Sequence, residues 1–255
     1  IYSGRSLGQI ALMAENYRSG LIWNTFMKDA KISQVNSVLF RDVTAPVINR
    51  FSVSDPASPT IGYTHSASVN VSIDDYDAVG IVRWLITETA VQPAVDDFTS
   101  KGSAAKLSVY TIAGSADGLK NLYVWAIDNS NNISSLSGNS QAQIYIDATP
   151  PSMGAVTADG PNLTLTDRLH ASWSALDNES GIIDYQYCIT DGAIDGPIVR
   201  DWASTGKVAE ATVTGLSLIK NHVYYFNAKA RNASGLWSNI SSSGALTMTQ
   251  TAPSI

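Results

Sequence analysis

Few residues in this chain have the types and spacing that chemistry needs, and the clearest are carboxylates in turn-like segments. Carboxylate oxygens are the ligands that Ca²⁺ prefers in proteins. The carboxylates form two groups, at 74–77 and at 177–179. Neither group has the spacing of a recognised calcium loop, and acidic turns between strands are common without a metal. We therefore expect no cofactor, with calcium as the alternative. Its candidate ligands are Asp74, Asp75, Asp77, Asp177 and Glu179.

Glu15 and Arg18 form a second candidate pair. They are three residues apart, which on a helix places both side chains on one face within salt-bridge reach. The pair suits either a structural ion pair or a role in a carbohydrate cleft. Glycoside hydrolysis normally needs two carboxylates that flank the scissile bond, and Glu15 supplies only one. We predict no catalytic residue in this chain.

Aromatic side chains suggest a different kind of site, a flat platform that stacks on sugar rings. Trp125 and Trp173 lie in alternating runs and are expected in the core. Trp202 and Trp237 lie in loop-like surroundings and are the candidate platform residues. Cys188 lies in an alternating apolar run, so it is expected to be a buried strand residue without a disulfide partner.

The charge balance limits the partners. The chain has a formal net charge of −6 and a sequence pI near 4.9, so it lacks the basic cluster that would bind nucleic acid. No apolar run reaches the length of about 18 to 20 residues that a membrane span needs. We therefore expect neither a nucleic-acid partner nor a membrane span.

Strands are the elements that must position these residues. From residue 42 onward apolar positions alternate with Ser, Asn and Thr, the period of a strand with one buried face. This pattern predicts strands at 47–53, 67–73, 81–87, 107–112, 121–128 and 141–146, with a turn at 74–77. It then predicts strands at 163–165, 169–174, 182–190, 211–213, 222–231 and 245–250.

A proline-bearing linker recurs along the chain, at 42–46, 147–151 and 251–253. The intervals are about a hundred residues, the length of one small β-sandwich. Gly80-Ile81 and Gly181-Ile182 repeat with the same offset. The chain is therefore expected to contain two tandem modules.

Residues 1–41 follow a helical period instead. Leu7, Ile10 and Ala14 share one face of a helix, and the spacing predicts helices at 7–17, 20–28 and 30–38. Helices this short are marginal alone in water. We expect them to pack against another part of the protein.

Sequence motifs in the second module are Leu-His-Ala-Ser-Trp at 169–173, Tyr-Tyr-Phe-Asn-Ala-Lys-Ala at 224–230 and Asn-Ala-Ser-Gly-Leu-Trp-Ser at 232–238. With them this module resembles the fibronectin type III-like modules of bacterial extracellular proteins. The resemblance implies that Trp173 and Tyr225 are core residues. The first module, through Val-Trp-Ala-Ile-Asp at 124–128, resembles a more divergent immunoglobulin-like relative.

The run Glu-Asn-Tyr-Arg-Ser-Gly-Leu at 15–21 is similar to the C-terminal part of the bacterial glucoamylase-like glycosidase family. That family has an (α/α)6 barrel and includes enzymes that act on β-glucans. At 6–9 the chain departs from the family pattern, which usually has an Asp before its Gln-Gly pair. Most of such a barrel would be encoded upstream.

The predicted fold class is mainly β, with two tandem immunoglobulin-like (fibronectin type III-like) sandwiches preceded by a short helical segment. The expected units are a helical remnant at 1–41, an immunoglobulin-like sandwich at 42–147, a fibronectin type III-like sandwich at 148–250 and the start of a further linker or module at 251–255.

The predicted function is non-catalytic: a spacer or docking arm of a secreted multidomain bacterial protein, attached to a glucoamylase-like glycosidase. The alternatives are a pair of carbohydrate-binding modules that tether the glycosidase to its polysaccharide, or adhesin-type surface modules. The expected partners are the upstream catalytic domain and polysaccharide or cell-surface components. The expected location is outside the cell or at its surface, with the periplasm as an alternative.

Overall fold

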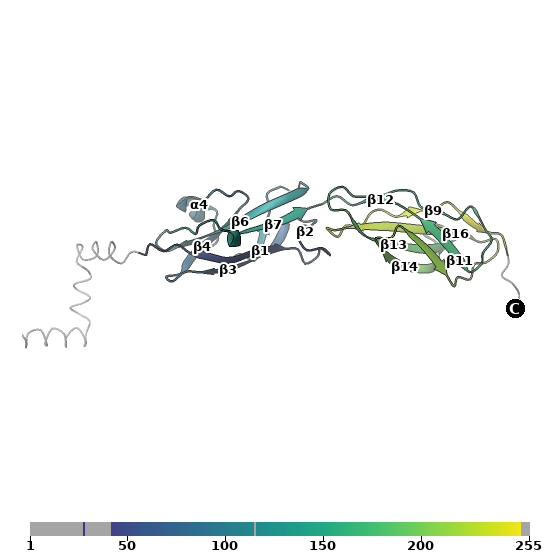
Figure 1. Ribbon diagram of the computed structural model, residues 1–255, viewed down its shortest axis with the longest axis horizontal. Coiled ribbons are helices and arrows are strands. Elements are labelled where there is room, and N and C mark those ends of the chain that lie inside the picture. The colour runs from purple at the N-terminus through teal and green to yellow at the C-terminus, as the bar shows by residue number, and fades with distance from the viewer. Residues whose placement is uncertain (1–27, 29–41, 115, 251–255) are drawn as a thin grey trace, which may run out of the picture.

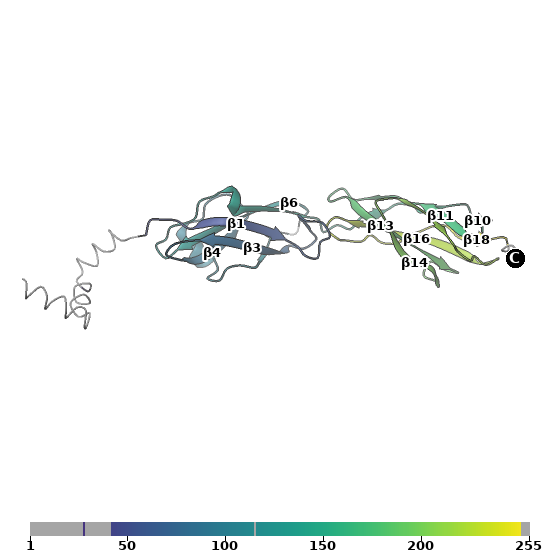
Figure 2. The same ribbon diagram turned by 60° about the horizontal axis from the view of Figure 1, so that its bottom comes forward.

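The computed structural model describes residues 28, 42–114 and 116–250. The helices predicted within 1–41 and the linker predicted at 251–253 lie outside the described residues. Two β-sandwiches follow each other along the long axis of the molecule, and both views show them end to end (Figures 1 and 2).

The first sandwich packs a sheet of order β1-β3-β5 against a sheet of order β2-β7-β6-β4. Its elements are β1 (Val47–Ser54), β2 (Tyr63–Thr64), β3 (Ser68–Tyr76), β4 (Ile81–Thr87), α4 (Val95–Ser100), β5 (Val109–Thr111), β6 (Gly118–Asp128), the 3-10 turn η1 (Gly138–Ser140) and β7 (Gln141–Ile146). Alternate side chains such as Val69, Val124 and Ile144 point between the sheets and are almost fully buried. Burying each such side chain contributes about 1.5–3 kcal/mol, so this interior holds the two sheets together.

The second sandwich packs a sheet of order β10-β18-β16-β13-β14 against a sheet of order β15-β11-β9. The short strand β17 pairs with β16, and β8 pairs with β12 at the edge. Its elements are β8 (Ser152–Met153), β9 (Thr157–Ala158), β10 (Asn162–Leu163), β11 (Arg168–Ser172), β12 (Ala175–Leu176), β13 (Ile182–Asp191), β14 (Ile198–Gly206), β15 (Glu210–Thr214), β16 (Val223–Asn232), β17 (Ser241–Ser242) and β18 (Leu246–Met248).

Aromatic rings fill the second core. The Trp173 ring lies 5.8 Å from that of Phe226, and both side chains are buried. Tyr224, near the start of β16, is also buried, and its hydroxyl accepts a hydrogen bond from the Ile219 N–H at 2.8 Å. A Tyr that bonds to backbone a few residues upstream of this strand is a recurring feature of immunoglobulin-like sandwiches. The core Tyr is therefore Tyr224, and the assignment of Tyr225, which is only half-buried, was wrong by one position.

The two modules share one register in their central strand pair. Trp84 faces Ala126 in the first module, and Tyr185 faces Ala230 in the second. Both pairs contain a bulge one residue after the Gly-Ile turn. The equivalence lets each position of one module be compared with its counterpart in the other.

The mainly β fold predicted from the sequence is confirmed, and the predicted cores at Trp125, Trp173 and Cys188 are buried. Helix α4, the 3-10 turn η1 and six strands were not predicted, namely β2, β8, β9, β12, β14 and β17. Strand β14 has no buried residue, so its sequence lacks the alternation that a half-buried strand shows. Helix α4 has six residues, too few to establish a helical period.

Candidate functional site

The outer face of the larger sheet in the second module carries a stack of rings and cations. The Lys229 Nζ atom lies 4.3 Å from the Trp202 ring centroid and 4.7 Å from the Trp237 ring centroid. Arg231 continues the stack, with its Cζ atom 5.6 Å from the Trp237 centroid. Lys229 and Arg231 share a face of β16 because side chains alternate along a strand. Each such contact contributes about 0.5–1 kcal/mol near a surface.

Both tryptophans predicted as a sugar platform belong to this stack. Trp202 lies on strand β14, so its assignment to a loop was wrong. Both rings are half-buried, and the ammonium group of Lys229 lies over both. The ammonium group therefore already covers one face of each ring. Sugar binding by these two residues stays a prediction.

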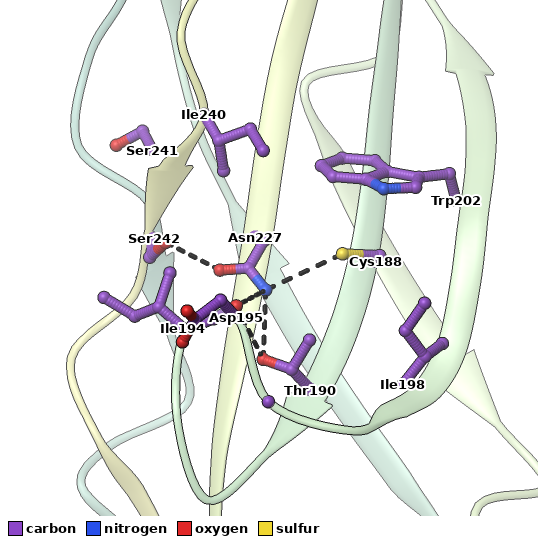
Figure 3. A pocket seen from close by; sticks show the side chains of 11 residues that line it. Cys188, Thr190, Ile194, Asp195, Ile198, Trp202, Asn227, Ile240, Ser241 and Ser242 are labelled. Carbon is purple, nitrogen blue, oxygen red and sulfur yellow. Dashed lines mark hydrogen bonds between the residues drawn. The ribbon is translucent and has the colours of Figure 1, made fainter.

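A hollow of about 640 Å³ lies beside Trp202 (Figure 3). The Trp202 ring lies above the Cys188 thiol, and Ile198 and Ile240 stand on either side of the opening. Burial raises the pKa of the Cys188 thiol above its usual range. The thiol is therefore a poor nucleophile at neutral pH, because the thiolate is the reactive form.

Asn227 forms the floor of the hollow and is 1% exposed. Its Nδ2 group donates to Thr190 Oγ1 at 3.1 Å and to the Ile194 carbonyl at 3.3 Å, and its Oδ1 atom accepts from Ser242 Oγ at 2.6 Å. Figure 3 shows these bonds closing the base of the hollow. A smaller hollow of about 490 Å³, lined by Trp237 and Met153, adjoins the first at Ile240.

Three carboxylates meet where the linker enters the first module. One carboxylate oxygen each from Asp42, Asp77 and Asp128 lie within 4.8 Å of one another. The Asn132 Nδ2 group donates to Asp128 Oδ2 at 2.8 Å and to the Asp42 carbonyl at 3.1 Å. Asp42 Oδ2 is buried and has no hydrogen-bond partner among the described residues. The donor atoms are hard oxygens of the kind that Ca²⁺ binds, and calcium at Asp77 stays a prediction.

Asp74 and Asp75 lie outside this cluster, and the turn predicted around them was wrong. Both are in strand β3, which continues because β1 pairs with it as far as Tyr76. Asp75 Oδ1 accepts from Lys106 Nζ at 2.6 Å, and Asp75 Oδ2 accepts from the Trp84 indole at 2.5 Å. Asp75 therefore forms an ion pair with the loop before β5 and a hydrogen bond to β4 of the other sheet.

The second module repeats the acidic cluster with Asp147, Asp177 and Glu179, again within 4.8 Å. Here Asn232 occupies the register position of Asp128. Its Nδ2 group donates to Asp147 Oδ2 at 2.8 Å and to Asp177 Oδ2 at 3.1 Å. A neutral amide thus bridges two carboxylates, and it supplies donors in the place where a cation would supply charge.

Burial raises the pKa of Asp147, and the hydrogen bond from the Ser180 hydroxyl opposes that shift. The sequence predictions included Asp177 and Glu179 but omitted Asp42, Asp128 and Asp147. Two of the omitted residues, Asp42 and Asp147, could have been identified from the sequence, because each is the aspartate that opens a proline-bearing linker. Glu15 and Arg18 lie outside the described residues.

The modules also touch directly at their joint. Ser58 Oγ donates to the Ala233 carbonyl at 3.1 Å, and His65 Nδ1 lies 3.0 Å from the Ser234 carbonyl oxygen. Gly235 faces Pro59 so closely that a Cβ atom would lie 3.0 Å from the proline ring. The linker of residues 147–151 is held by Asn232, whose Nδ2 group also donates to the Thr149 carbonyl at 3.1 Å.

The strand order defines two immunoglobulin-like (fibronectin type III-like) sandwiches, and the tyrosine contact is found in the second. No protein-family model matches the chain, and no similar sequence was found among curated proteins.

Solved structures with a similar arrangement include domains A168–A170 of titin, with 16% identity, coverage of 79% of this chain and 68% of that chain, and a TM-score of 0.42. The FN1–FN3 domains of chicken CNTN1 have 13% identity, coverage of 78% and 65%, and a TM-score of 0.44. The D00–D0 domain of intimin has 15% identity, coverage of 78% and 100%, and a TM-score of 0.30. Similarity at this level supports no further argument. The class of fold therefore rests on the strand order.

Across the described ranges, no helix is both long and apolar enough to span a lipid bilayer.

Proposed function

We propose that this chain is a non-catalytic spacer and docking arm that holds neighbouring parts of a secreted, multidomain protein at a set distance. The observation that carries the proposal is the joint between the sandwiches. A linker of five residues, 147–151, connects β7 to β8, and both Pro150 and Pro151 restrict it. The linker and the direct contacts both resist bending.

Three kinds of interaction support a stiff joint. Two hydrogen bonds cross between the modules, donated by Ser58 to the Ala233 carbonyl and by His65 to the Ser234 carbonyl. Gly235 and Pro59 are in close contact. The buried Asp147 side chain links the linker to Ser180 and Asn232 of the second module. Hydrogen bonds of this kind contribute about 0.5–1.5 kcal/mol each, enough together to favour one orientation.

The finer part of the proposal concerns the parent protein. The similarity of 15–21 to glucoamylase-like glycosidases supports a catalytic barrel on the N-terminal side, with the two sandwiches as its arm. On this proposal the protein acts outside the cell or at its surface, and the arm itself performs no reaction. The upstream gene sequence tests this part, since it should encode a helical barrel with paired carboxylates.

Small-angle X-ray scattering tests the arm. The wild-type chain should give the distance distribution of two modules in one fixed end-to-end orientation. The double variant Ser58→Ala/His65→Ala should broaden that distribution. His222→Ala is the matched control, because His222 bonds to Asp191 within the second module at 2.7 Å and should leave scattering unchanged.

Two results would contradict the proposal. Wild-type scattering typical of freely jointed modules would remove the stiff arm. Release of reducing sugar from a glucan by this chain alone would show that it is an enzyme.

A further inference from the structure

The larger sheet of the first module has an uncharged polar area on its outer face. Helix α4 covers this face around Trp125, and the part formed by β2, β7 and the first half of β6 lies beyond that cover. Side chains alternate along a strand, so every second residue there points outward. Three of these outward residues are tyrosines, three are amides and one is Leu119. The chain has only 11 tyrosines in 255 residues, so tyrosine is concentrated here. We call the six polar residues the tyrosine-amide face: Tyr63, Asn121, Tyr123, Gln141, Gln143 and Tyr145.

Strand pairing places rings at both ends of this face and amides between them. Gln143 lies opposite Asn121 in the middle, and Gln141 lies opposite Tyr123 at one end. Tyr145 lies at the other end, four residues from Gln141 along β7. Four residues of a strand span about 13 Å. An arrangement of this length suits an extended ligand rather than a single small group.

The rings at the two ends are held in place by their neighbours. The centroid of the Tyr145 ring lies 5.7 Å from that of Tyr63. Tyr123 packs against the cluster around Phe98. All three tyrosines are half-buried, so part of each side chain remains in contact with water. Because these rings are already packed, a ligand that contacts them would cost little side-chain entropy.

The amides in the middle present a donor next to an acceptor. Gln143 Nε2 donates to Asn121 Oδ1 at 2.7 Å. This bond leaves Gln143 Oε1 as an acceptor and Asn121 Nδ2 as a donor, and neither atom is hydrogen-bonded within the described residues. The pair borders a hollow of about 350 Å³, which is also lined by Tyr123 and Gln141.

A sugar ring has the complementary chemistry. Each hydroxyl group both donates and accepts, so two neighbouring hydroxyls can bond to an adjacent acceptor and donor. The C–H face of a sugar can pack on a tyrosine ring, which combines an apolar body with a polar tip. No residue that lines the hollow is charged. A neutral sugar would therefore desolvate no charge, whereas an ionic ligand would leave its own charge unpaired.

The second module lacks this arrangement. The shared register places Tyr225 at the position of Asn121, and Asn227 at the position of Tyr123. Asn227 is buried, and its amide already bonds to Thr190 and Ser242. The donor and acceptor pair therefore belongs to the first module.

We propose that the tyrosine-amide face binds a neutral polysaccharide. One sugar ring occupies the hollow, where Gln143 and Asn121 bond to its hydroxyls, and the polymer continues along β7 toward Tyr145. The arm would then hold a polymer as well as set a distance. This proposal does not depend on the stiff joint, because all of its residues lie in the first module.

The test begins with the full chain on an array of neutral and anionic oligosaccharides. Binding should be restricted to neutral glycans and should not change with salt, because no charge is involved. NMR titration with the neutral oligosaccharide that binds most tightly should shift the side-chain amide signals of Asn121 and Gln143.

A matched pair of variants tests the amides. Asn121→Leu removes the donor and breaks the amide pair, so it should weaken binding by about tenfold. Asn70→Leu is the control, since Asn70 is also an exposed strand amide of the first module but lies in β3 of the other sheet. Binding by this control should change by less than about twofold. Thermal unfolding should show that both variants remain folded.

A second pair of variants tests the length of the site. Tyr145→Ala should weaken binding of a hexasaccharide several-fold and have less effect on a disaccharide, which fits within the hollow. Tyr76→Ala is the control, because Tyr76 is 65% exposed on β3 of the other sheet. Its binding of both oligosaccharides should match that of the wild type.

Four outcomes would overturn the proposal. The first is an array on which no neutral glycan binds, and the second is stronger binding of anionic glycans. The third is an equal loss of binding in Asn121→Leu and Asn70→Leu. The fourth is a shift of the Asn121 and Gln143 signals with protein concentration alone, which would assign the face to contact between copies of the chain.

Discussion

At equivalent positions of the central strand pair, the first module has Leu85 of β4 opposite Trp125 of β6. The second module has Gln186 of β13 opposite Lys229 of β16. In the first module Phe98 of α4 packs on this pair and forms a small second core. In the second, Trp202 from strand β14 packs on Lys229. The same sheet face is therefore closed by an apolar cluster in one module and by a ring and cation stack in the other.

The difference teaches that a shared register does not determine what covers a sheet. Between β4 and β5 the first module forms helix α4, whereas between β13 and β15 the second module forms the edge strand β14. The helix seals its face, whereas the edge strand leaves a hollow beside it.

The largest expected effect comes from removing the ring that seals the first face. Phe98→Ala should lower the free energy of unfolding of the first module by about 3–5 kcal/mol, because it leaves a cavity against Leu85 and Trp125. Trp202→Ala should cost the second module less, since that ring is half-buried. Urea unfolding followed by near-UV circular dichroism measures both, and equal losses would contradict the comparison.

A second prediction concerns a feature that the modules share. Ser134 Oγ accepts from the Ala126 N–H at 3.0 Å, and Ser238 Oγ accepts from the Ala230 N–H at 2.9 Å. Replacing either serine by alanine leaves a buried N–H unsatisfied, which should cost about 1–3 kcal/mol. Thermal unfolding of the two single variants should show similar losses. A large inequality would mean that the modules are less equivalent than their register implies.

Breaking the cation stack should have a smaller effect. Lys229→Gln removes the charge between Trp202 and Trp237 and should lower stability by about 0.5–1 kcal/mol. The NMR signals of both indoles should shift, because each ring loses the adjacent cation. Lys120→Gln serves as a control in the first module. Unchanged indole signals in Lys229→Gln would show that the stack does not persist in solution.

The smallest expected effects are on pH dependence, and they have opposite signs in the two linkers. Hydrogen bonds from Thr44 lower the pKa of Asp42, so its contribution to stability is present above the usual value of 3.8 and is lost as pH falls through the lowered pKa. Burial raises the pKa of Asp147, so its contribution is greatest below 3.8 and is lost as pH rises through the raised pKa.

Chemical denaturation of Asp42→Asn and Asp147→Asn from acid to neutral pH tests this contrast. Relative to wild type, Asp147→Asn should remove a fall in stability with rising pH, and Asp42→Asn should remove a rise. Slopes of the same sign in the two difference curves would contradict the assignment.

Several features of the site were predictable because they depend on short stretches of chain. Asp77 and Asp177 each stand in a turn before a repeated Gly-Ile pair, and both belong to acidic clusters. The remaining members were not predicted because they come from other parts of the chain: Asp42 and Asp147 from linkers, and Asp128 from the end of β6. Their meeting depends on how strands pair, which no local pattern encodes.

The sequence by itself determined the strand period, the identity of core residues such as Trp125 and Trp173, and the tandem repeat of its linkers. These follow from one-sided burial, which imposes a period of two on any strand that covers a core. Only the tertiary structure decided that Trp202 stacks on Lys229, that Ser58 reaches Ala233, and that a hollow opens beside the edge strand. Those contacts join residues far apart in the chain, so they depend on register and on the path of each connection, and exposed segments carry no hydrophobic period to reveal them.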